Sequence, residues 1–191
     1  MSRRRLRVAG IDPSLTGTGV AVLTQGPEIV SEVLVRSRGR RTDTWPQRVG
    51  RVVSVAEQVS EQVQQTDLVV MEAPSYGHAL EPGFYDRAML TCAIAERLAS
   101  PWLMVPPTVV KKWATGDGAA GKALVTARIR RFLPDAELKT SDVADAAAMA
   151  LIGLSRLGGI EVVSKVRARL VDALQWPDPM SEALVGGEEP K

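Results

Sequence analysis

Four carboxylate residues stand out along this chain, because each lies where a strand or helix is expected to end or begin. Asp12 follows the apolar run RVAGI, Glu72 ends the run DLVVM, and Asp142 and Asp145 open the segment SDVADAAAMALIGL. A carboxylate beside an apolar core is unfavourable unless a partner neutralises it, and a divalent cation with oxygen ligands is a common partner. The four side chains together predict a Mg²⁺ site suited to phosphodiester hydrolysis.

The spacing of Asp142 and Asp145 places both on one face of a helix, because residues three apart are neighbours on the helix surface. That face continues through Met149 and Ile152, which we expect to turn toward the sheet. The alternative is that Asp142 or Ser141 caps the helix and that the helix dipole favours a second acid in the first turn. Capping explains Asp142 but leaves the inward direction of Asp145 unexplained.

Asp12 and Glu72 also have simpler interpretations. An Asp before a proline commonly starts a turn, and a Glu at a strand end can be solvated. Two features favour the metal site. Small residues follow Asp12 in PSLTGTG and allow a polyanion to approach the backbone. If the two strands run parallel, both carboxylates lie at the edge of the sheet where ligands collect in α/β proteins.

Three lysines flank the glycine-containing loop 116–121, namely Lys111, Lys112 and Lys122. A lysine at the start of a helix can reach a phosphate beside the metals, so we expect these residues to contact DNA. The loop is not a P-loop, because Ala123 follows Lys122 where that motif has Ser or Thr. The alternative for each lysine is a solvated surface charge.

Composition limits the class of protein. With 191 residues, of which 45% are hydrophobic, the chain is long enough for one well-packed domain. No apolar run reaches the roughly 18 residues of a membrane span. The single cysteine, Cys92, excludes an internal disulfide, and its apolar neighbours predict a reduced, buried thiol. We therefore expect a cytoplasmic protein with no membrane contact.

The charge is unevenly distributed although the net charge is only +2. Residues 1–51 contain ten arginines and four acidic residues. Guanidinium groups bind phosphate oxygens, so this segment predicts a phosphate-rich partner, with Arg38, Arg40 and Arg41 as candidate DNA contacts. The alternative is a solvated charged face. The last fourteen residues, DPMSEALVGGEEPK, predict an acidic mobile tail.

Apolar runs and turn signals predict the elements that position these residues. Strands are expected at 6–11, 20–23, 29–35, 68–71 and 102–105, and helices at 45–65, 84–99, 120–132 and from 142 onward. Three antiparallel strands followed by strands that alternate with helices make an α/β protein, with a mixed sheet covered on both faces. We expect one domain over 1–160 and an extension over 161–191 with a short helix and the tail.

The loop between the Glu72 strand and the next helix contains SYGHALEPG. Tyr76 is the best candidate there for stacking on an unpaired base. Phe84 and Tyr85 border the loop and fit either stacking or the core of the following helix. His78 is the only histidine, and one histidine does not make a zinc site.

The order of the motifs resembles the RuvC family of Holliday-junction resolvases. The resemblance is carried by GIDPSLTGTGVAVL, VVMEAP, VPPTVVKKWATGDGAAGK and SDVADAAAMAL, over residues 7–157. It implies a ribonuclease-H-like fold with five strands, a homodimer, two Mg²⁺ ions that Mn²⁺ can replace, and paired symmetric nicking of four-way DNA junctions. It implies no nucleotide cofactor.

The same resemblance implies roles for individual residues. Asp12, Glu72, Asp142 and Asp145 match the family's metal-binding acids, and Lys111 and Lys122 match its two active-site lysines. The family's aromatic wedge falls on Ser75 here, with Tyr76 one residue later. The Arg-rich N-terminus and the segment after 160 also depart from the bacterial pattern, and this compact form is similar to bacteriophage-encoded members.

Three other readings stay open at the level of sequence. A ribonuclease H or a broader branched-DNA debranching nuclease would keep the fold and change the substrate. A sugar-kinase or actin-like ATPase has a similar first hairpin but needs two copies of the fold, and this chain has room for one. A non-enzymatic junction-binding protein would have lost its acids, whereas all four are present.

Overall fold

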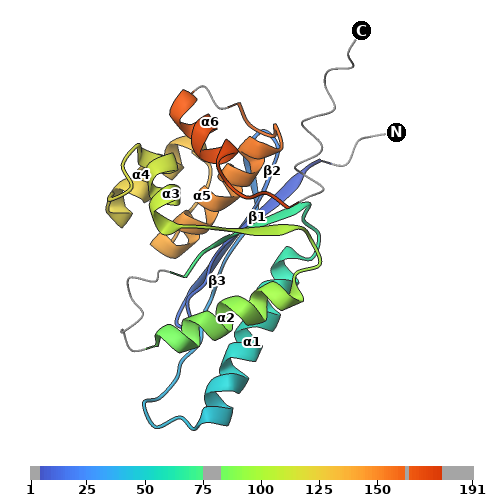
Figure 1. Ribbon diagram of the computed structural model, residues 1–191, viewed down its shortest axis with the longest axis vertical. Coiled ribbons are helices and arrows are strands. Elements are labelled where there is room, and N and C mark those ends of the chain that lie inside the picture. Colours follow the sequence, from blue (N-terminus) through green and yellow to red (C-terminus); the bar gives the residue numbers. More distant parts are fainter. Residues whose placement is uncertain (1–4, 75–82, 162–163, 178–191) are drawn as a thin grey trace.

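The computed structural model describes residues 5–74, 83–161 and 164–177. A five-stranded sheet with the order β3-β2-β1-β4-β5 runs through its centre (Figure 1). Strands β1 to β3 are antiparallel neighbours, while β1, β4 and β5 run parallel to one another. The strands are β1 Arg7–Asp12, β2 Thr18–Thr24, β3 Glu28–Val35, β4 Leu68–Glu72 and β5 Trp102–Val105. The predicted mixed sheet is confirmed.

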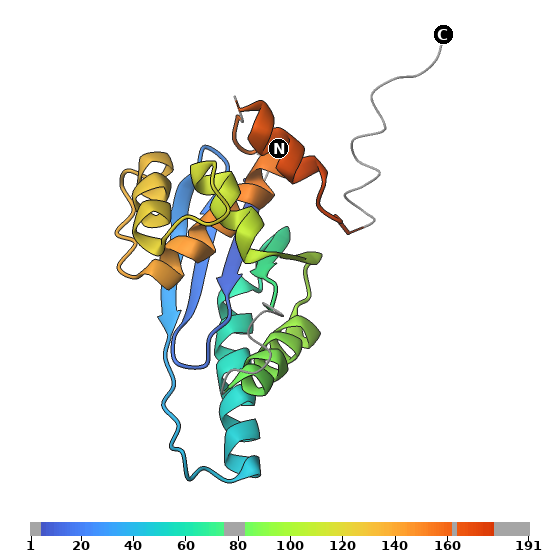
Figure 2. The same cartoon turned by 60° about the vertical axis from the view of Figure 1, so that its left-hand side comes forward.

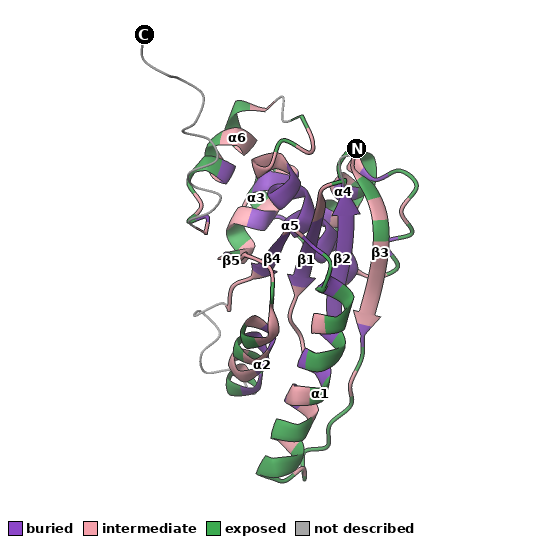
Figure 3. Ribbon diagram, turned by 90° about the vertical axis from the view of Figure 1, so that its right-hand side faces the viewer, coloured by how far each residue is buried: buried purple, intermediate pink, exposed green. Residues whose placement is uncertain are grey.

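Helices cover both faces of the sheet (Figures 1 and 2). One face packs against α1 Trp45–Val63 and α2 Phe84–Arg97, and the other packs against α5 Ser141–Arg156. Around α5 lie α3 Pro107–Thr115, α4 Lys122–Phe132 and α6 Lys165–Asp172. Figure 3 shows the buried strands between these two layers. Because successive side chains of a strand point to opposite faces, the apolar residues of the strands contribute to two separate hydrophobic clusters, one on each face.

The helix α5 lies directly on the backbone of β1 and β2. A Cβ atom on Gly10 would lie 1.8 Å from the carbonyl oxygen of Ala146, and one on Gly19 would lie 2.1 Å from that of Asp142. On the helix side, a Cβ on Gly153 would lie 2.6 Å from Val8. Glycine is thus required at these crossing points by close approach. For Gly19 this is a different reason from the predicted approach of a polyanion.

The opposite face is packed through larger side chains. Valines of α1, such as Val55 and Val59, fill the space above β1 and β2. Tyr85 on α2 is 74% exposed. Of its two interpretations, stacking or a place in the core, the core position is therefore wrong. Cys92 is also exposed, and the prediction of a buried thiol is wrong. Its neighbours Ala93 and Ala95 are partly buried against the core cluster of this face, whereas Cys92 itself lies on the exposed side of α2.

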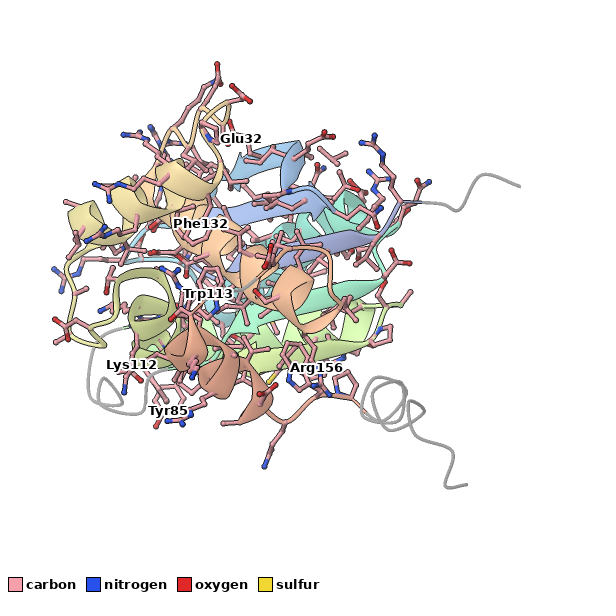
Figure 4. The ribbon with its side chains drawn as sticks, turned by 90° about the horizontal axis from the view of Figure 1, so that it is seen from above. Glu32, Tyr85, Lys112, Trp113, Phe132 and Arg156 are labelled. Atoms are coloured by element: carbon pink, nitrogen blue, oxygen red, sulfur yellow. The ribbon has the colours of Figure 1, made fainter. Side chains whose placement is uncertain are left out.

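Helix α3 is not among the helices expected from the sequence, because Pro106 and Pro107 directly follow the strand at 102–105 and resemble its end. Arg167 of α6 holds it in place. The Arg167 guanidinium donates to the carbonyls of Trp113 at 2.7 Å and Ala114 at 3.2 Å. It also lies 4.9 Å from the ring centroid of Phe132, which stacks on Trp113 (Figure 4). The helix of the C-terminal extension thus packs on the same core as the rest.

Some predicted features lie outside the described residues. These are Ser75, Tyr76 and His78 in the loop before α2, and the acidic segment 178–191. Across the described residues, no helix combines the length and the apolar character that crossing a membrane requires.

Candidate active site

Asp12 and Glu72 lie next to each other at the end of two paired strands. Strands β1 and β4 run parallel with Ile11 opposite Met71, so the next residue on each strand is the acid. Both acids lie where a fully buried strand ends. Because parallel strands bring their carboxyl ends to one edge of a sheet, the predicted meeting of these two side chains follows directly from topology.

The first turn of α5 brings the other two acids to the same edge. The N-cap is Thr140, whose side chain accepts a hydrogen bond from the amide of Val143 at 3.3 Å. Neither Asp142 nor Ser141 is the cap, so the alternative interpretation of Asp142 is wrong. The carboxylate of Asp142 instead accepts a hydrogen bond from Lys122 Nζ at 3.1 Å. Asp145 follows one turn later and exerts its charge on both Asp12 and Glu72.

The four acids share one open cleft of about 690 Å³. Its walls come from the β1–β2 turn, the segment after β4, the start of α2, the start of α3 and the first residues of α4 and α5. The residues that line it are Asp12, Pro13, Ser14, Glu72, Ala73, Pro74, Phe84, Arg87, Thr91, Pro106, Pro107, Thr108, Lys111, Lys122, Asp142 and Asp145. Four carboxylates and three basic residues therefore meet around a space large enough for a phosphodiester.

Burial and mutual repulsion make it difficult to ionise these carboxylates together. Burial, followed by the charges of Glu72, Asp145 and Asp142, raises the pKa of Asp12 to about 8. Burial and then Asp145 raise the pKa of Glu72 to about 7, and burial first of all raises that of Asp145 to about 6. Such displaced values are typical of functional sites, because a bound cation or substrate supplies the missing compensation.

The two lysines expected in the active site both line the cleft. Lys122 is the first residue of α4. Its partial burial acts to lower its pKa, but the hydrogen bond and charge of Asp142, with the charges of Asp12 and Asp145, outweigh that effect and raise it. Lys111 on α3 counteracts the raised pKa of both Glu72 and Asp145.

The other predicted DNA contacts lie elsewhere. Lys112 is exposed on α3 and does not line the cleft, and Figure 4 shows it toward the periphery of the molecule. Arg38, Arg40 and Arg41 are exposed on the connection between β3 and α1, also outside the cleft. These four residues remain candidates for contacts with parts of a substrate beyond the reacting phosphate.

Arg87 is a site residue that sequence reasoning missed. It lines the cleft from α2, and its charge counteracts the raised pKa of Glu72. Thr91, one helical turn later, lines the cleft on the same side of α2. No sequence signal marks either residue, because an arginine on a helix is usually solvated and only the packing of α2 brings this face to the end of β4.

The donor set fits a hard divalent cation. All four acids offer oxygen ligands, which suit Mg²⁺ or Mn²⁺ better than softer metals. Within the described part of the chain, no three acidic, histidine or cysteine side chains already form a closed set around one point. Burial and raised pKa values mean that these oxygens lack charge compensation, and the single ammonium hydrogen-bonded to Asp142 supplies only part of it.

Comparisons with known proteins agree on one family. The sequence model described as "Crossover junction endodeoxyribonuclease RuvC" matches residues 8–153. A relative of that name from Rhodospirillum rubrum is 33% identical, with 81% of this chain and 99% of the relative covered. Another, from Rhodopirellula baltica, is 31% identical, with 76% of this chain and 84% of the relative covered.

Solved structures give the same result for the fold. A structure of Thermus thermophilus RuvC superposes with a TM-score of 0.62 at 24% identity and covers 81% of this chain and 98% of that one. The same protein in complex with Holliday junction substrate gives a TM-score of 0.56 at 25% identity, with 81% and 97% covered. The expected ribonuclease-H-like architecture is confirmed.

Proposed function

The chain belongs to the crossover junction endodeoxyribonuclease family RuvC, and we propose that it resolves four-way DNA junctions by metal-assisted hydrolysis in the cleft described above. The observation that carries this proposal is the meeting of four carboxylates from β1, β4 and α5 with two lysines in one open cleft. Phosphodiester hydrolysis with Mg²⁺ requires carboxylates that hold the metal next to cationic side chains that bind the phosphate.

The four acids would hold two divalent cations, with Mg²⁺ as the resident metal and Mn²⁺ as a substitute. Asp12 is the best candidate to bridge the two cations, because the charges of all three other acids act on it. The cations would supply Lewis-acid stabilisation of the charge on the attacking and leaving oxygens. Glu72, Asp142 and Asp145 complete the ligand set.

The lysines act on the phosphate itself. Lys122 and Lys111 line the cleft from α4 and α3. Each would bind a non-bridging oxygen of the scissile phosphate and offset the negative charge that develops during displacement. Replacing Lys122 with alanine should lower kcat by roughly 10²-fold, the effect of removing one such donor.

Paired nicking requires two active sites on one substrate, so the protein would act as a homodimer. A two-fold dimer presents two equal clefts to a junction that has near two-fold symmetry. Helix α2 is the candidate interface, since its exposed residues include Tyr85 and Cys92. Sedimentation should give a dimer at micromolar concentration, and a monomer that still makes paired nicks would disprove this part of the proposal.

The test incubates the protein with end-labelled four-way junction, Y-fork, linear duplex and RNA–DNA hybrid, with and without Mg²⁺. We expect symmetric nicks in the junction only, and only with the metal. Asp145→Asn should lose at least about a hundredfold in cleavage rate but still bind the junction, because the change leaves the shape of the side chain intact.

A matched control removes a carboxylate of the same kind elsewhere. Asp135 is exposed between α4 and α5 and does not line the cleft, so Asp135→Asn should cleave like the unmodified protein. Full Mg²⁺-dependent activity of Asp145→Asn would overturn the site assignment. Cleavage of forks would point to a broader debranching nuclease, and cleavage of hybrids to a ribonuclease H, with the same fold and site.

A further inference from the structure

A second hollow, of about 380 Å³, lies beside the catalytic cleft and is lined mainly by arginines. Its walls are the β1–β2 turn, the connection between β3 and α1, the first half of α1 and the start of α2. Four arginines line it, namely Arg40, Arg41, Arg48 and Arg51. Guanidinium groups that converge on one hollow favour an anion with several oxygens, such as a phosphate.

The two acids of this hollow are already engaged and do not neutralise it. Asp86 accepts two hydrogen bonds of 2.6 Å from Arg48, and that pair joins α2 to α1. Asp43 accepts a hydrogen bond of 2.7 Å from the backbone amide of Arg40, which folds the connection into a turn. With Arg48 paired, three arginines and one structural carboxylate remain, so the hollow stays cationic.

Arg51 lines the hollow from α1. Its guanidinium lies against the backbone of Gly39, where a Cβ atom would be only 1.4 Å from Nη1 of Arg51. Its Nε is buried and has no hydrogen-bond partner among the described residues. A buried guanidinium nitrogen without an acceptor is unfavourable, and an incoming anion close to this guanidinium would supply the missing compensation.

The hollow and the catalytic cleft share their boundary. Thr16 lines the hollow and Ser14 lines the cleft, and their hydroxyl groups lie 3.3 Å apart in the same turn. On α2, Asp86 lines the hollow, and it lies along the chain between Phe84 and Arg87, which line the cleft. A polymer that leaves the cleft between the turn and α2 therefore enters the hollow next.

The connection that carries the arginines is held in position. The hydroxyl of Ser37 donates a hydrogen bond to the carbonyl of Leu15, which ties the connection to the β1–β2 turn. Asp43 closes the turn by donating its own amide to the carbonyl of Arg40 at 3.1 Å. Arg40 and Arg41 are thus presented on an ordered segment, which reduces the entropy lost when they bind.

We propose that this hollow binds the sugar–phosphate backbone of the DNA strand that leaves the catalytic cleft, through Arg40, Arg41 and Arg51. The inference rests on the proposed function and adds a defined subsite to it. It also separates these residues from Arg38, which is exposed on the same connection but does not line the hollow.

The salt dependence of binding tests the subsite. The affinity for a fluorescent four-way junction is measured in EDTA, which prevents cleavage, over a range of salt concentrations. Each phosphate contact contributes about 0.9 to the slope of log K against log salt. The double variant Arg40→Ala/Arg41→Ala should make this negative slope shallower by about 1 to 2 and weaken binding roughly tenfold.

The matched control removes the same charge outside the hollow. Arg36 belongs to the same connection but lines a different hollow with Glu137 and Thr140, and Arg131 is exposed on α4. Arg36→Ala/Arg131→Ala should keep the slope within about 0.5 of the unmodified protein. Equal losses in the two double variants would mean that general charge matters and would overturn the subsite.

The outcomes also separate this inference from the proposed function. If the unmodified protein cuts junctions and the Arg40/Arg41 variant binds with an unchanged slope, the subsite is wrong and the resolvase function stands. If the unmodified protein cuts only forks or hybrids, the same titration is run with that substrate. A reduced slope in the Arg40/Arg41 variant alone then supports the subsite although junction resolution has failed.

Discussion

The two faces of the sheet are packed in different ways. On one face α5 touches β1 and β2 through backbone atoms, with Gly10 and Gly19 opposite alanines and the helix start. On the other face α1 rests on valines, and α1 and α2 leave Trp45 and Tyr85 exposed at 57% and 74%. Backbone contact sets the distance between two elements more narrowly than contact between flexible side chains.

This difference shows how the cleft is positioned. The two acids of α5 meet those of β1 and β4 on the side where the backbone of the helix lies in direct contact with the sheet. The α1/α2 side contributes Arg87 and Thr91, which line the cleft beside the acids. The tightly packed face thus holds the two acids of α5, and the α1/α2 face supplies one wall of the cleft.

The largest contrast is expected from the same substitution on each face. Gly10→Ala would place a Cβ atom 1.8 Å from the carbonyl oxygen of Ala146, so the free energy of unfolding should fall by at least about 3 kcal/mol. Gly50→Ala, at an exposed position of α1 with nothing within 4 Å of the new atom, should raise it by about 0.5–1 kcal/mol. Denaturant unfolding measures both, and effects of the same sign would contradict the contrast.

A smaller effect concerns pH, because the buried acids lie with the tightly packed face. The pKa of Asp12 is raised from 3.8 to about 8, so the folded protein keeps a proton there that the unfolded chain releases. In EDTA the free energy of unfolding should therefore be highest near pH 4 and fall by on the order of 2–4 kcal/mol as the pH rises to 8. Asp12→Asn should remove a large part of this fall, while the raised pKa values of Glu72 and Asp145 account for the rest, and Mg²⁺ should reduce it.

The effect of pH on stability is measured as the thermal midpoint of unfolding of the unmodified protein and of Asp12→Asn between pH 4 and pH 8. An equally steep fall in Asp12→Asn would mean that other groups control it. The sign is fixed by linkage: the folded state binds more protons than the unfolded state between the two pKa values, so stability decreases with pH there.

A third prediction concerns α6, which packs on the α5 side through a side chain. Arg167→Met should remove two hydrogen bonds to carbonyls of α3 and the contact with the Phe132 ring, and lower the free energy of unfolding by about 1–3 kcal/mol. Arg169→Met, on the exposed side of the same helix, should change it by less than about 0.5 kcal/mol. Equal effects of the two changes would show that Arg167 is not what fixes α6.

The smallest effect is expected on the α1/α2 face. Cys92 is exposed on α2, so Cys92→Ser should change the free energy of unfolding by less than about 0.5 kcal/mol. The native monomer should also react rapidly with a thiol reagent. A thiol that reacts only after denaturation would mean that Cys92 is covered, and its protection at dimer-forming concentrations would identify α2 as the interface.

The strands could be predicted from the sequence because their signals are local. Each apolar run is bounded by Gly, Pro or an acid, and the structure places all five strands within two residues of the predicted bounds. The meeting of Asp12 and Glu72 followed from the parallel pairing of two such strands. Topology and residue type were therefore enough for the carboxylates.

The parts that were missed depend on tertiary packing or on weak local signals. Helix α3 has nine residues with two β-branched valines after two prolines, which resembles the end of a strand, although Pro at a first helical position was the available clue. The segment KTSD offers several caps for α5, and only the structure selects Thr140. Arg87 enters the cleft because of how α2 packs, and its sequence neighbours carry no trace of this.

The backbone contact between α5 and the sheet limits which amino-acid substitutions the protein can accept as its sequence diverges. Where side chains fill the space between two elements, a loss of volume at one position can be offset by a gain at another. Where a carbonyl oxygen lies against Gly10 or Gly19, no such exchange exists, since any larger residue must move the whole helix. The surrounding apolar positions are therefore free to diverge, while the two glycines keep the distance between β1 and the first turn of α5 constant.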